Sequence, residues 1–319
     1  MFVYAWGCVQ RDRFDSSGGG FYNRRTKLAS MHTSNMSSHV LQTDKKSLPI
    51  GVFDSGVGGL TVLRALRNAL PRESFIYLGD TARLPYGTKS RDSVLRYSLQ
   101  ASEFLMSRGV KYLVVACNTA SSVALDALAE RFAPTPVLGV IEPGAAAGCK
   151  ASRHGGIVVV ATEGTVRGGA YQRCIKAIRP DARVHAQACS LFVALAEEGW
   201  ASGNIVEAVA HRYLDEAFQT GSFDTLLLGC THFPVLIDAL RTVVGPTVSI
   251  VDSAATTAEA LALQLERANL ATQATAGRVS LMATDGPERF ARVGSQFLGE
   301  HFAASDVEIV DLGQPAAAS

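Results

Sequence analysis

The stretch KYLVVACNTASS, residues 111–122, decides the fold class of this 319-residue chain. Residues 112–116 are all apolar, which is typical of a β-strand buried on both faces of a parallel sheet. The small and polar residues after Cys117 predict that a helix begins immediately. A buried strand that passes directly into a helix indicates an α/β fold, in which helices cover the faces of the sheet.

The same alternation of apolar runs and amphipathic stretches continues on both sides of this segment. Strands are expected at 50–53, 74–78, 111–116, 156–161, 183–188, 224–228, 278–283 and 307–310, and helices at 60–66, 90–107, 169–178, 205–220 and 288–297. This order predicts an α/β protein with mostly parallel sheets flanked by helices. Ligands of such sheets bind at the carboxyl ends of the strands.

The length of the chain suggests about two lobes, on the prior of roughly 150 residues for each. We expect one lobe to comprise residues 48–139 together with 253–319, whose last strands would complete its sheet, and the other to comprise 140–252. The chain would cross between the lobes in the Pro- and Gly-containing segment 139–144 and again near Asp252.

Residues 1–47 differ from the rest, because they are rich in Ser, Gly, Asn, Thr and basic residues and show little periodicity. We expect them to form a flexible extension. Met31 and Met36 are alternative translation starts that would remove most of it. The opening residues have no basic n-region and no adequate apolar core, so a secretory signal is not expected.

Composition limits the partners of this chain. A net charge of +1 argues against nucleic acid or an anionic membrane as the main partner, and no apolar run approaches the ~18 residues of a membrane-spanning helix. The partner is therefore expected to be a small molecule. The sequence does not determine the oligomeric state, and a homodimer stays an open alternative.

The cysteines, at positions 8, 117, 149, 174, 189 and 230, form no C-x-x-C pair and no zinc-like spacing with histidine. We expect no metal and no disulfide framework. Most of these side chains, including Cys149 and Cys174, are predicted to be buried, reduced thiols in a cytoplasmic protein.

Two of the cysteines occupy matching positions. Cys117 in ACNTAS and Cys230 in GCTHFP each end an apolar strand, and each is followed by polar residues that include a threonine. If the two lobes pack across a cleft, both thiols would face one small ligand. Inversion of a carbon that carries an acidic hydrogen needs such a pair, because one group removes the proton while the other supplies one from the opposite face.

A thiol suits this chemistry when its pKa is lowered at a helix N-terminus. We expect Thr119 or Ser121 to cap the helix after Cys117. Chance coincidence of two buried, strand-end cysteines is the competing interpretation. His232 follows Cys230 by two residues and could exchange its proton, although a histidine there is also typical of a surface or capping residue.

The segment DSGVGG, residues 54–59, places an acid, a hydroxyl and three glycines between the first strand and its helix. Glycines there would let backbone N–H groups approach an anion such as a substrate carboxylate. The G-x-G-x-x-G and P-loop spacings are absent, which disfavours dinucleotides and triphosphates. Asp54 is expected to be either a catalytic partner or a plain cap of the following helix.

Taken together, these segments resemble glutamate racemase, of the aspartate/glutamate racemase superfamily. The resemblance covers about residues 48–312. It rests on FDSGVGGLTVL from Phe53, YLGDTARLPYGTKS from Tyr77, VVACNTAS from Val114, GVIEPG from Gly139, ATEGTVRGGAY from Ala161, ACSLFVALAEEG from Ala188, LLLGCTHFPVL from Leu226, VDSA from Val251 and ATDGPERF from Ala283.

The resemblance implies two pseudo-symmetric α/β lobes with the active site between them, and cofactor-independent interconversion of L- and D-glutamate that supplies D-glutamate for peptidoglycan. It also implies that Cys117 is the acid/base for D-glutamate, assisted by Asp54, and that Cys230 is its counterpart for L-glutamate, assisted by His232. The remaining substrate-binding positions of the family correspond to Ser55, Tyr86, Gly87, Asn118, Thr119 and Thr231, and acidic residues implicated in some members correspond to Asp80 and Glu197.

The chain departs from the family pattern at three positions, which bear on specificity and cleft closure rather than on the reaction. The family often has Ser where this chain has Gly168, and commonly has Pro at the positions of Ser190 and Ala194. Alternative functions are a racemase of another acidic amino acid or of a hydantoin, a related single-thiol decarboxylase, a non-catalytic protein that closes on an acidic ligand, and a cysteine hydrolase that uses Cys230 and His232.

Overall fold

The computed structural model describes residues 45–219 and 221–313. The expected extension at 1–47 therefore lies outside the described residues, except for its last three. These form a short 3-10 helix, η1 (Lys45–Ser47). Lys111 reaches this turn, since its Nζ atom donates to the carbonyl of Lys46 at 2.7 Å.

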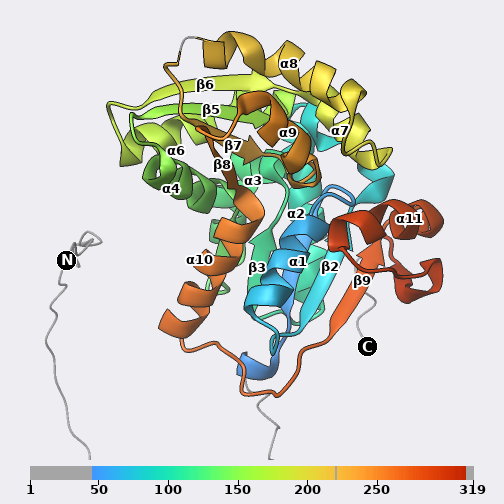
Figure 1. The fold of residues 1–319 in the computed structure, drawn as a ribbon. Coiled ribbons are helices and arrows are strands. Elements are labelled where there is room, and N and C mark those ends of the chain that lie inside the picture. The colour runs from blue at the N-terminus through green and yellow to red at the C-terminus, as the bar shows by residue number, and fades with distance from the viewer. Residues whose placement is uncertain (1–44, 220, 314–319) are drawn as a thin grey trace, which may run out of the picture. The chain divides into compact units, whose positions relative to one another are not determined.

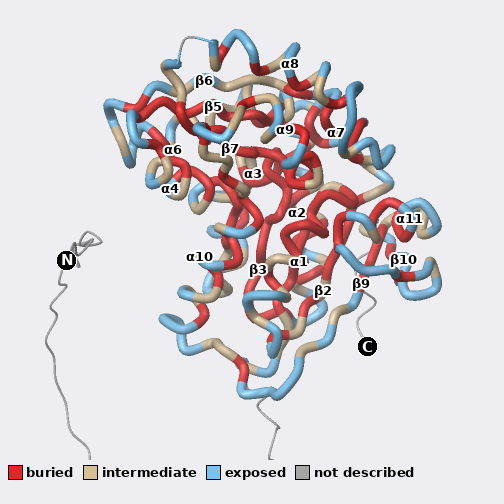
Figure 2. The backbone as a smooth tube through the Cα atoms, viewed as in Figure 1, coloured by how far each residue is buried: buried red, intermediate tan, exposed pale blue. Residues whose placement is uncertain are grey.

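The first sheet has six strands in the order β10-β9-β2-β1-β3-β4, and all neighbours run parallel. Its strands are β1 (Ile50–Asp54), β2 (Phe75–Gly79), β3 (Tyr112–Val115), β4 (Val137–Gly139), β9 (Val279–Ala283) and β10 (Val307–Ile309). The C-terminal strands do complete this sheet, as the sequence predicted. Every residue of β1 and β3 is buried, because helices lie on both faces (Figures 1 and 2).

The second sheet has four parallel strands in the order β6-β5-β7-β8. They are β5 (Gly156–Ala161), β6 (Arg183–Ala188), β7 (Thr225–Gly229) and β8 (Ser249–Asp252). Both central strands, β5 and β7, are buried along their whole length. The predicted α/β fold class with two parallel sheets is therefore confirmed.

The helices are α1 (Leu60–Ala69), α2 (Arg91–Ser107), α3 (Asn118–Arg131), α4 (Ile141–Ala151), α5 (Glu163–Gly168), α6 (Ala170–Ile178), α7 (Ser190–Glu197), α8 (Asn204–Gln219), α9 (Ile237–Val244), α10 (Ser253–Arg267) and α11 (Pro287–Leu298). Short 3-10 helices lie at η2 (Thr81–Arg83), η3 (Tyr86–Thr88), η4 (Phe233–Leu236) and η5 (Ala304–Asp306).

The helix predicted at 169–178 differs from the structure. It is preceded by α5, which starts at Glu163 because the Thr162 hydroxyl accepts a hydrogen bond from the Thr165 N–H. Gly169 then separates α5 from α6 with a φ of 66°, a left-handed conformation that glycine adopts at little cost. Helices α4, α7, α9 and α10 and strands β4 and β8 were not anticipated.

Two helices carry the chain between the sheets. Helix α4 follows β4 of the first sheet and leads into β5 of the second. Helix α10 follows β8 of the second sheet and packs along α1 of the first and against α4 (Figure 1). The segments around Gly139 and Asp252 are thus the places where the chain passes from one sheet to the other.

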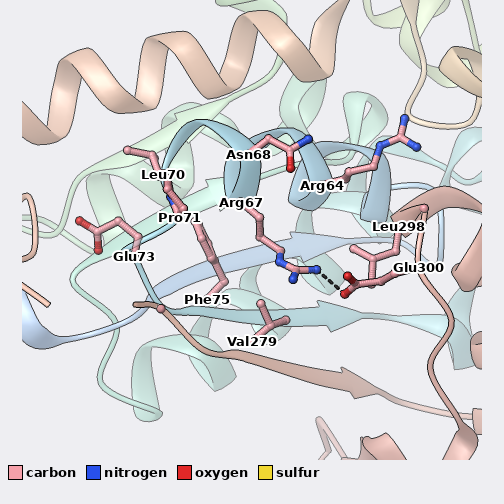
Figure 3. Close-up of a pocket in the computed structure, with 12 residues that line it drawn as sticks. Arg64, Arg67, Asn68, Leu70, Pro71, Glu73, Phe75, Val279, Leu298 and Glu300 are labelled. Carbon is pink, nitrogen blue, oxygen red and sulfur yellow. Dashed lines mark hydrogen bonds and ion pairs between the residues drawn. The ribbon is translucent and has the colours of Figure 1, made fainter. Parts of the chain in front are cut away.

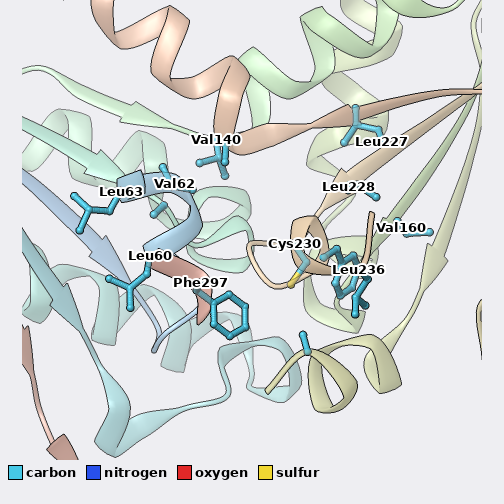
Figure 4. Packing of buried hydrophobic residues seen from close by; sticks show 14 of the residues in the cluster. Leu60, Val62, Leu63, Val140, Val160, Leu227, Leu228, Cys230, Leu236 and Phe297 are labelled. Atoms are coloured by element: carbon cyan, nitrogen blue, oxygen red, sulfur yellow. The ribbon is translucent and has the colours of Figure 1, made fainter. Parts of the chain in front are cut away.

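The hydrophobic core is continuous between the two lobes. One cluster of buried side chains includes Leu63 of α1, Val140 before α4, Leu227 of β7 and Phe297 of α11 (Figure 4). Burial of these residues stabilises the packing of one lobe on the other, because separating them would expose the apolar surface to water. The cluster reaches Cys230, so the second thiol rests on this shared core.

Candidate active site

A cavity of about 260 Å³ lies at the carboxyl ends of β1, β3, β5 and β7 and brings the two predicted thiols together. From the first lobe it is lined by Ser55, Leu84, Pro85, Tyr86, Gly87, Thr88, Cys117, Asn118 and Thr119, and from the second by Thr162, Glu163, Ser190, Val193, Ala194, Glu197, Cys230, Thr231 and His232. Its size suits a small molecule. Of the predicted site residues, only Asp54 and Asp80 do not line it.

Cys117 itself caps α3. Its Sγ atom accepts a hydrogen bond from the Ala120 N–H at 3.4 Å, and its thiol lies 3.6 Å from Oγ of Ser55. The predicted caps, Thr119 and Ser121, are wrong, because the Ser121 hydroxyl donates instead to the carbonyl of Val115. A helix that starts at the strand end leaves the cysteine in the capping position.

The environment of Cys117 favours the neutral thiol. Burial, and then the neighbouring Asp54 carboxylate, raise its pKa to about 12, and the Ala120 N–H opposes this only in part. The expectation that the helix N-terminus would lower this pKa towards neutrality is therefore wrong. Removal from water outweighs the hydrogen bonds with the Ala120 N–H and with Ser55, so Cys117 is a neutral thiol in this environment.

Asp54 is fully buried and is the last residue of β1. Its Oδ2 atom accepts from the Gly56 N–H at 2.9 Å, whereas Oδ1 has no hydrogen-bond partner among the described residues. Asp54 does not cap α1, since that helix begins at Leu60 and its N-cap residue, Gly59, provides no side-chain cap. Burial raises its pKa, partly offset by the charge of His232 and by backbone N–H groups. A carboxyl held in this way can exchange a proton with its surroundings.

The glycines of the 54–59 loop do not line the cavity, contrary to expectation; among these residues only Ser55 does. They allow a close approach between the lobes instead. A Cβ atom on Gly58 would come within 2.4 Å of both Nδ1 of His232 and Oγ1 of Thr231. The Thr61 hydroxyl of α1 then donates to the carbonyl of Thr231 at 2.9 Å, which fixes the loop after Cys230.

Cys230 begins a series of polar contacts that follows the cavity wall through His232 and Glu197 and ends outside the cavity at Arg289. Its Sγ atom lies 3.8 Å from Nδ1 of His232, and Nε2 of His232 lies 3.0 Å from Oε1 of Glu197. Oε2 of Glu197 accepts from Nη2 of Arg289 at 2.7 Å. His232 is buried rather than a surface residue, with its ring edge-on to Phe297 at 5.2 Å between centroids.

The protonation states of His232 and Glu197 depend on their hydrogen bonds with each other and with their neighbours. Burial opposes protonation of His232, but its hydrogen bonds with Cys230 and Glu197 outweigh burial and raise its pKa to about 10. For Glu197, burial favours the neutral acid, yet the hydrogen bonds from His232 and Arg289 lower its pKa to about 2. At neutral pH the pair is therefore an imidazolium and a carboxylate, and the imidazolium faces the Cys230 sulfur.

Polar side chains near Cys117 tie the two lobes together. The Tyr171 hydroxyl of α6 donates to Oδ1 of Asn118 at 2.7 Å. The Thr119 hydroxyl lies 2.8 Å from that of Thr162 and 3.2 Å from that of Thr165. Nδ2 of Asn118 is buried and has no partner among the described residues, which leaves a donor beside the cavity for an acceptor on a bound molecule.

Tyr86 and Asp80 lie one behind the other. Tyr86 lines the cavity and its hydroxyl donates to Oδ2 of Asp80. Asp80 is fully buried, pairs with Nε of Arg83 at 2.7 Å and accepts from the Thr284 hydroxyl at 3.1 Å. Asp80 is therefore placed to hold Tyr86 in position rather than to contact a ligand.

The three departures from the family pattern fall in two places. Ser190 and Ala194, on α7, line the cavity. Gly168 lines a neighbouring groove of about 320 Å³ with the basic residues Lys89, Arg91, Arg167 and Arg173. Sequence reasoning missed Arg289, Tyr171 and Thr61, because only tertiary packing brings them to the site, and it also missed Thr162. Thr162 follows β5 at its carboxyl end and had a positional signal.

A larger cavity of about 450 Å³ lies away from the thiols (Figure 3). It is bounded by α1, by the first residues of β2 and β9, and by the end of α11, and an ion pair between Arg67 and Glu300 crosses it. It opens near the amino ends of the strands, opposite to the edge that carries the cysteines. None of the predicted site residues lines it.

The other described cysteines are all free thiols. Cys189 is buried, but Cys149 and Cys174 are only partly buried, contrary to the expectation.

Over residues 45–219 and 221–313, no group of three or more His, Cys, Asp or Glu side chains is arranged to hold a metal ion. None of the helices in the same ranges has the length and apolar character needed to cross a membrane.

Known proteins are similar to this chain in sequence and in fold. Residues 50–261 match the family model described as Asp/Glu/Hydantoin racemase. A glutamate racemase from Geobacter metallireducens is 49% identical over 251 residues, which cover 78% of this chain and 92% of the relative. Among solved structures, glutamate racemase from Francisella tularensis in complex with D-glutamate aligns with a TM-score of 0.78 at 36% identity, covering 84% of this chain and 99% of that one.

Glutamate racemase from Thermus thermophilus in complex with β-chloro-D-alanine aligns with a TM-score of 0.76 at 43% identity, and covers 84% of this chain and 98% of its own. These similarities extend over both lobes and almost the whole length of each relative. The family model alone spans well over half of this sequence. The chain therefore belongs to the Asp/Glu/Hydantoin racemase family.

Proposed function

We propose that this protein is a glutamate racemase, an isomerase that interconverts L- and D-glutamate with two thiols and no cofactor. The observation that carries the proposal is that Cys117 from one lobe and Cys230 from the other line the same small cavity. Close relatives at 49% and 43% identity are glutamate racemases, which supports glutamate as the substrate.

In the direction from L- to D-glutamate, the Cys230 thiolate removes the α-hydrogen and the Cys117 thiol delivers a proton to the opposite face. The product state then holds a Cys230 thiol and a Cys117 thiolate, and the reverse reaction uses the same groups with exchanged roles. The imidazolium of His232 balances the charge of a Cys230 thiolate. Asp54 lies near Cys117 and exchanges a proton with the Cys117 sulfur.

The α-hydrogen of an amino acid is a very weak acid, so the site must stabilise negative charge as it develops. Donors are available from Asn118 Nδ2, which has no other partner, and from the hydroxyls of Ser55, Thr119 and Thr231 around the cavity. These groups hold the substrate carboxylates, and Tyr86 and Gly87 close one wall. Exclusion of water from the closed site strengthens each of these interactions.

Racemisation of a different acidic amino acid or of a hydantoin is the alternative. The cavity chemistry fits any small molecule that carries a carboxylate and an acidic α-hydrogen. A single-thiol decarboxylase or a cysteine hydrolase would leave one of the two cysteines without a role, and a pure binding protein would need neither. Identity to glutamate racemases over both lobes favours glutamate.

The protein supplies D-glutamate for peptidoglycan and acts in the cytoplasm in this proposal. The described cysteines are unpaired, in accord with a reducing compartment. A homodimer stays a prediction.

The deciding experiment follows L-glutamate in deuterated buffer by chiral chromatography and mass spectrometry. We expect D-glutamate to appear with deuterium at Cα. Cys230→Ala should abolish racemisation, while slow exchange of the α-hydrogen of D-glutamate persists through Cys117. Full racemisation by Cys230→Ala would refute the two-thiol mechanism, and turnover of aspartate but not glutamate would refute the substrate.

A further inference from the structure

Helix α11 belongs to the first sheet's lobe but touches the catalytic side of the second. It follows β9, and its residues Arg289, Gln296 and Phe297 recur at intervals of seven and eight positions, which places them on one face. Arg289 contacts Glu197, and the Phe297 ring packs on His232. A Cβ atom on Gly199 would meet the Gln296 side chain at 3.1 Å, so this face also follows the end of α7.

The two carboxylate oxygens of Glu197 contact residues of different lobes. One of its oxygens accepts from His232 of its own lobe at 3.0 Å, and the other accepts from Arg289 of the opposite lobe at 2.7 Å. With both oxygens engaged, the carboxylate has one orientation, and that orientation points Nδ1 of His232 at the Cys230 sulfur. Without Arg289, the carboxylate could rotate about its last bond and the imidazole would lose its fixed partner.

We propose that Arg289 is a positioning residue of this racemase, which aligns His232 with Cys230 through Glu197 only while the two lobes are packed together. The inference rests on the proposed function. Arg289 does not line the cavity, and it acts through Glu197 rather than on the substrate.

The expected size of the two effects favours a positioning role for Arg289 over a contribution to folding stability. The Arg289 side chain is 46% exposed, whereas that of Glu197 is 16% exposed. An ion pair with one partner so accessible to water contributes little to folding. The geometric effect is larger, since a small misplacement of a catalytic group can cost up to about 100-fold in rate.

The charged groups around Glu197 and His232 determine in which direction the loss of Arg289 shifts the pH dependence of activity. Glu197 faces His232 and Arg289, and His232 in turn faces Cys230, Glu197 and, from the first lobe, Asp54. Loss of Arg289 removes a positive charge and a donor from Glu197, and both changes raise the pKa of that carboxyl. Protonation of Glu197 would then lower the activity at a higher pH than in the intact protein.

The experiment compares Arg289→Gln, Arg289→Lys and, as a matched control, Arg292→Gln, which changes an exposed residue of the same helix. We expect Arg289→Gln to lower kcat/KM about tenfold, equally in both directions because the two enantiomers have the same free energy. The acidic limb of its kcat/KM profile should move to higher pH. Arg289→Lys should return the acidic limb to its position in the intact enzyme. Arg292→Gln should have the same kcat/KM profile as the intact enzyme.

A uniform loss of activity in Arg289→Gln without movement of the acidic limb would mean a merely structural role and overturn the inference. Equal behaviour of Arg289→Gln and Arg292→Gln would also overturn it. Titration of the Glu197 side-chain carbon by ¹³C NMR, assigned with Glu197→Gln, gives a readout that needs no turnover. If the intact protein failed to racemise glutamate, the proposed function would fail, while this titration would still decide the role of Arg289.

Discussion

The Tyr171 hydroxyl donates to Oδ1 of Asn118 at 2.7 Å, so a residue of one lobe orients the side chain that follows Cys117 in the other. The bond leaves Nδ2 of Asn118 free to meet a ligand beside the cavity. In the proposed function, substrate recognition beside Cys117 therefore depends on the position of Tyr171 in α6.

Tyr171→Phe should weaken substrate binding more than the chemical step. The ring still fills its buried site, but the Asn118 amide loses the partner that fixes its orientation. We expect KM for either enantiomer to rise about tenfold, which corresponds to one hydrogen bond of about 1.4 kcal/mol, with kcat changed less than threefold. Initial rates over a range of substrate concentrations measure this. A lower kcat at unchanged KM would contradict the assignment.

Gly58→Ala should inactivate the enzyme although the residue bears no chemistry. The added Cβ atom would lie 2.4 Å from Nδ1 of His232, so the imidazole must move away from Cys230. A displacement of about 1 Å predicts a fall in kcat of about 100-fold. Gly168→Ala is the matched control, because its Cβ atom would meet no atom closer than 3.3 Å. Equal activities of the two variants would show that the contact is unimportant.

Glu197→Gln should shift the pH dependence of the reaction on its alkaline side. His232 has its pKa raised to about 10, with hydrogen bonds to Cys230 and Glu197 outweighing burial. Activity that needs the imidazolium is present below this value and falls as the pH rises through it. Removal of the carboxylate lowers the pKa of His232, so the alkaline limb of kcat/KM should move to lower pH. A profile identical to that of the intact enzyme would remove Glu197 from the mechanism.

Lys111→Met should destabilise the fold without touching the site. The Lys111 side chain is fully buried, and its Nζ atom lies 2.6 Å from Oε2 of Glu73, which is itself 4% exposed. Loss of the cation leaves a buried carboxylate without its partner, which costs about 3–5 kcal/mol. Urea unfolding measures this change, and Lys150→Met, at an exposed lysine, should differ from the intact protein by about 0.5 kcal/mol or less.

The local sequence by itself determined the buried strands, the positions of the two cysteines and the edge of the sheets at which the cavity lies. The apolar runs at 112–116 and 226–228 predict buried parallel strands, and both cysteines lie at strand ends, because a strand buried on two faces is mostly apolar. Parallel sheets place their carboxyl ends at one edge, so the cavity could be predicted from order alone. Family motifs supplied Tyr86, Gly87 and Glu197, which no periodicity marks.

Only the tertiary structure decided how the groups act on one another. The raised pKa of Cys117 comes first from burial, and burial depends on both lobes rather than on the capping position that the sequence reveals. The contacts of Arg289 with Glu197 and of Tyr171 with Asn118 join residues 92 and 53 positions apart. Such pairs leave no periodic signal, because they form only where folding brings the two lobes together.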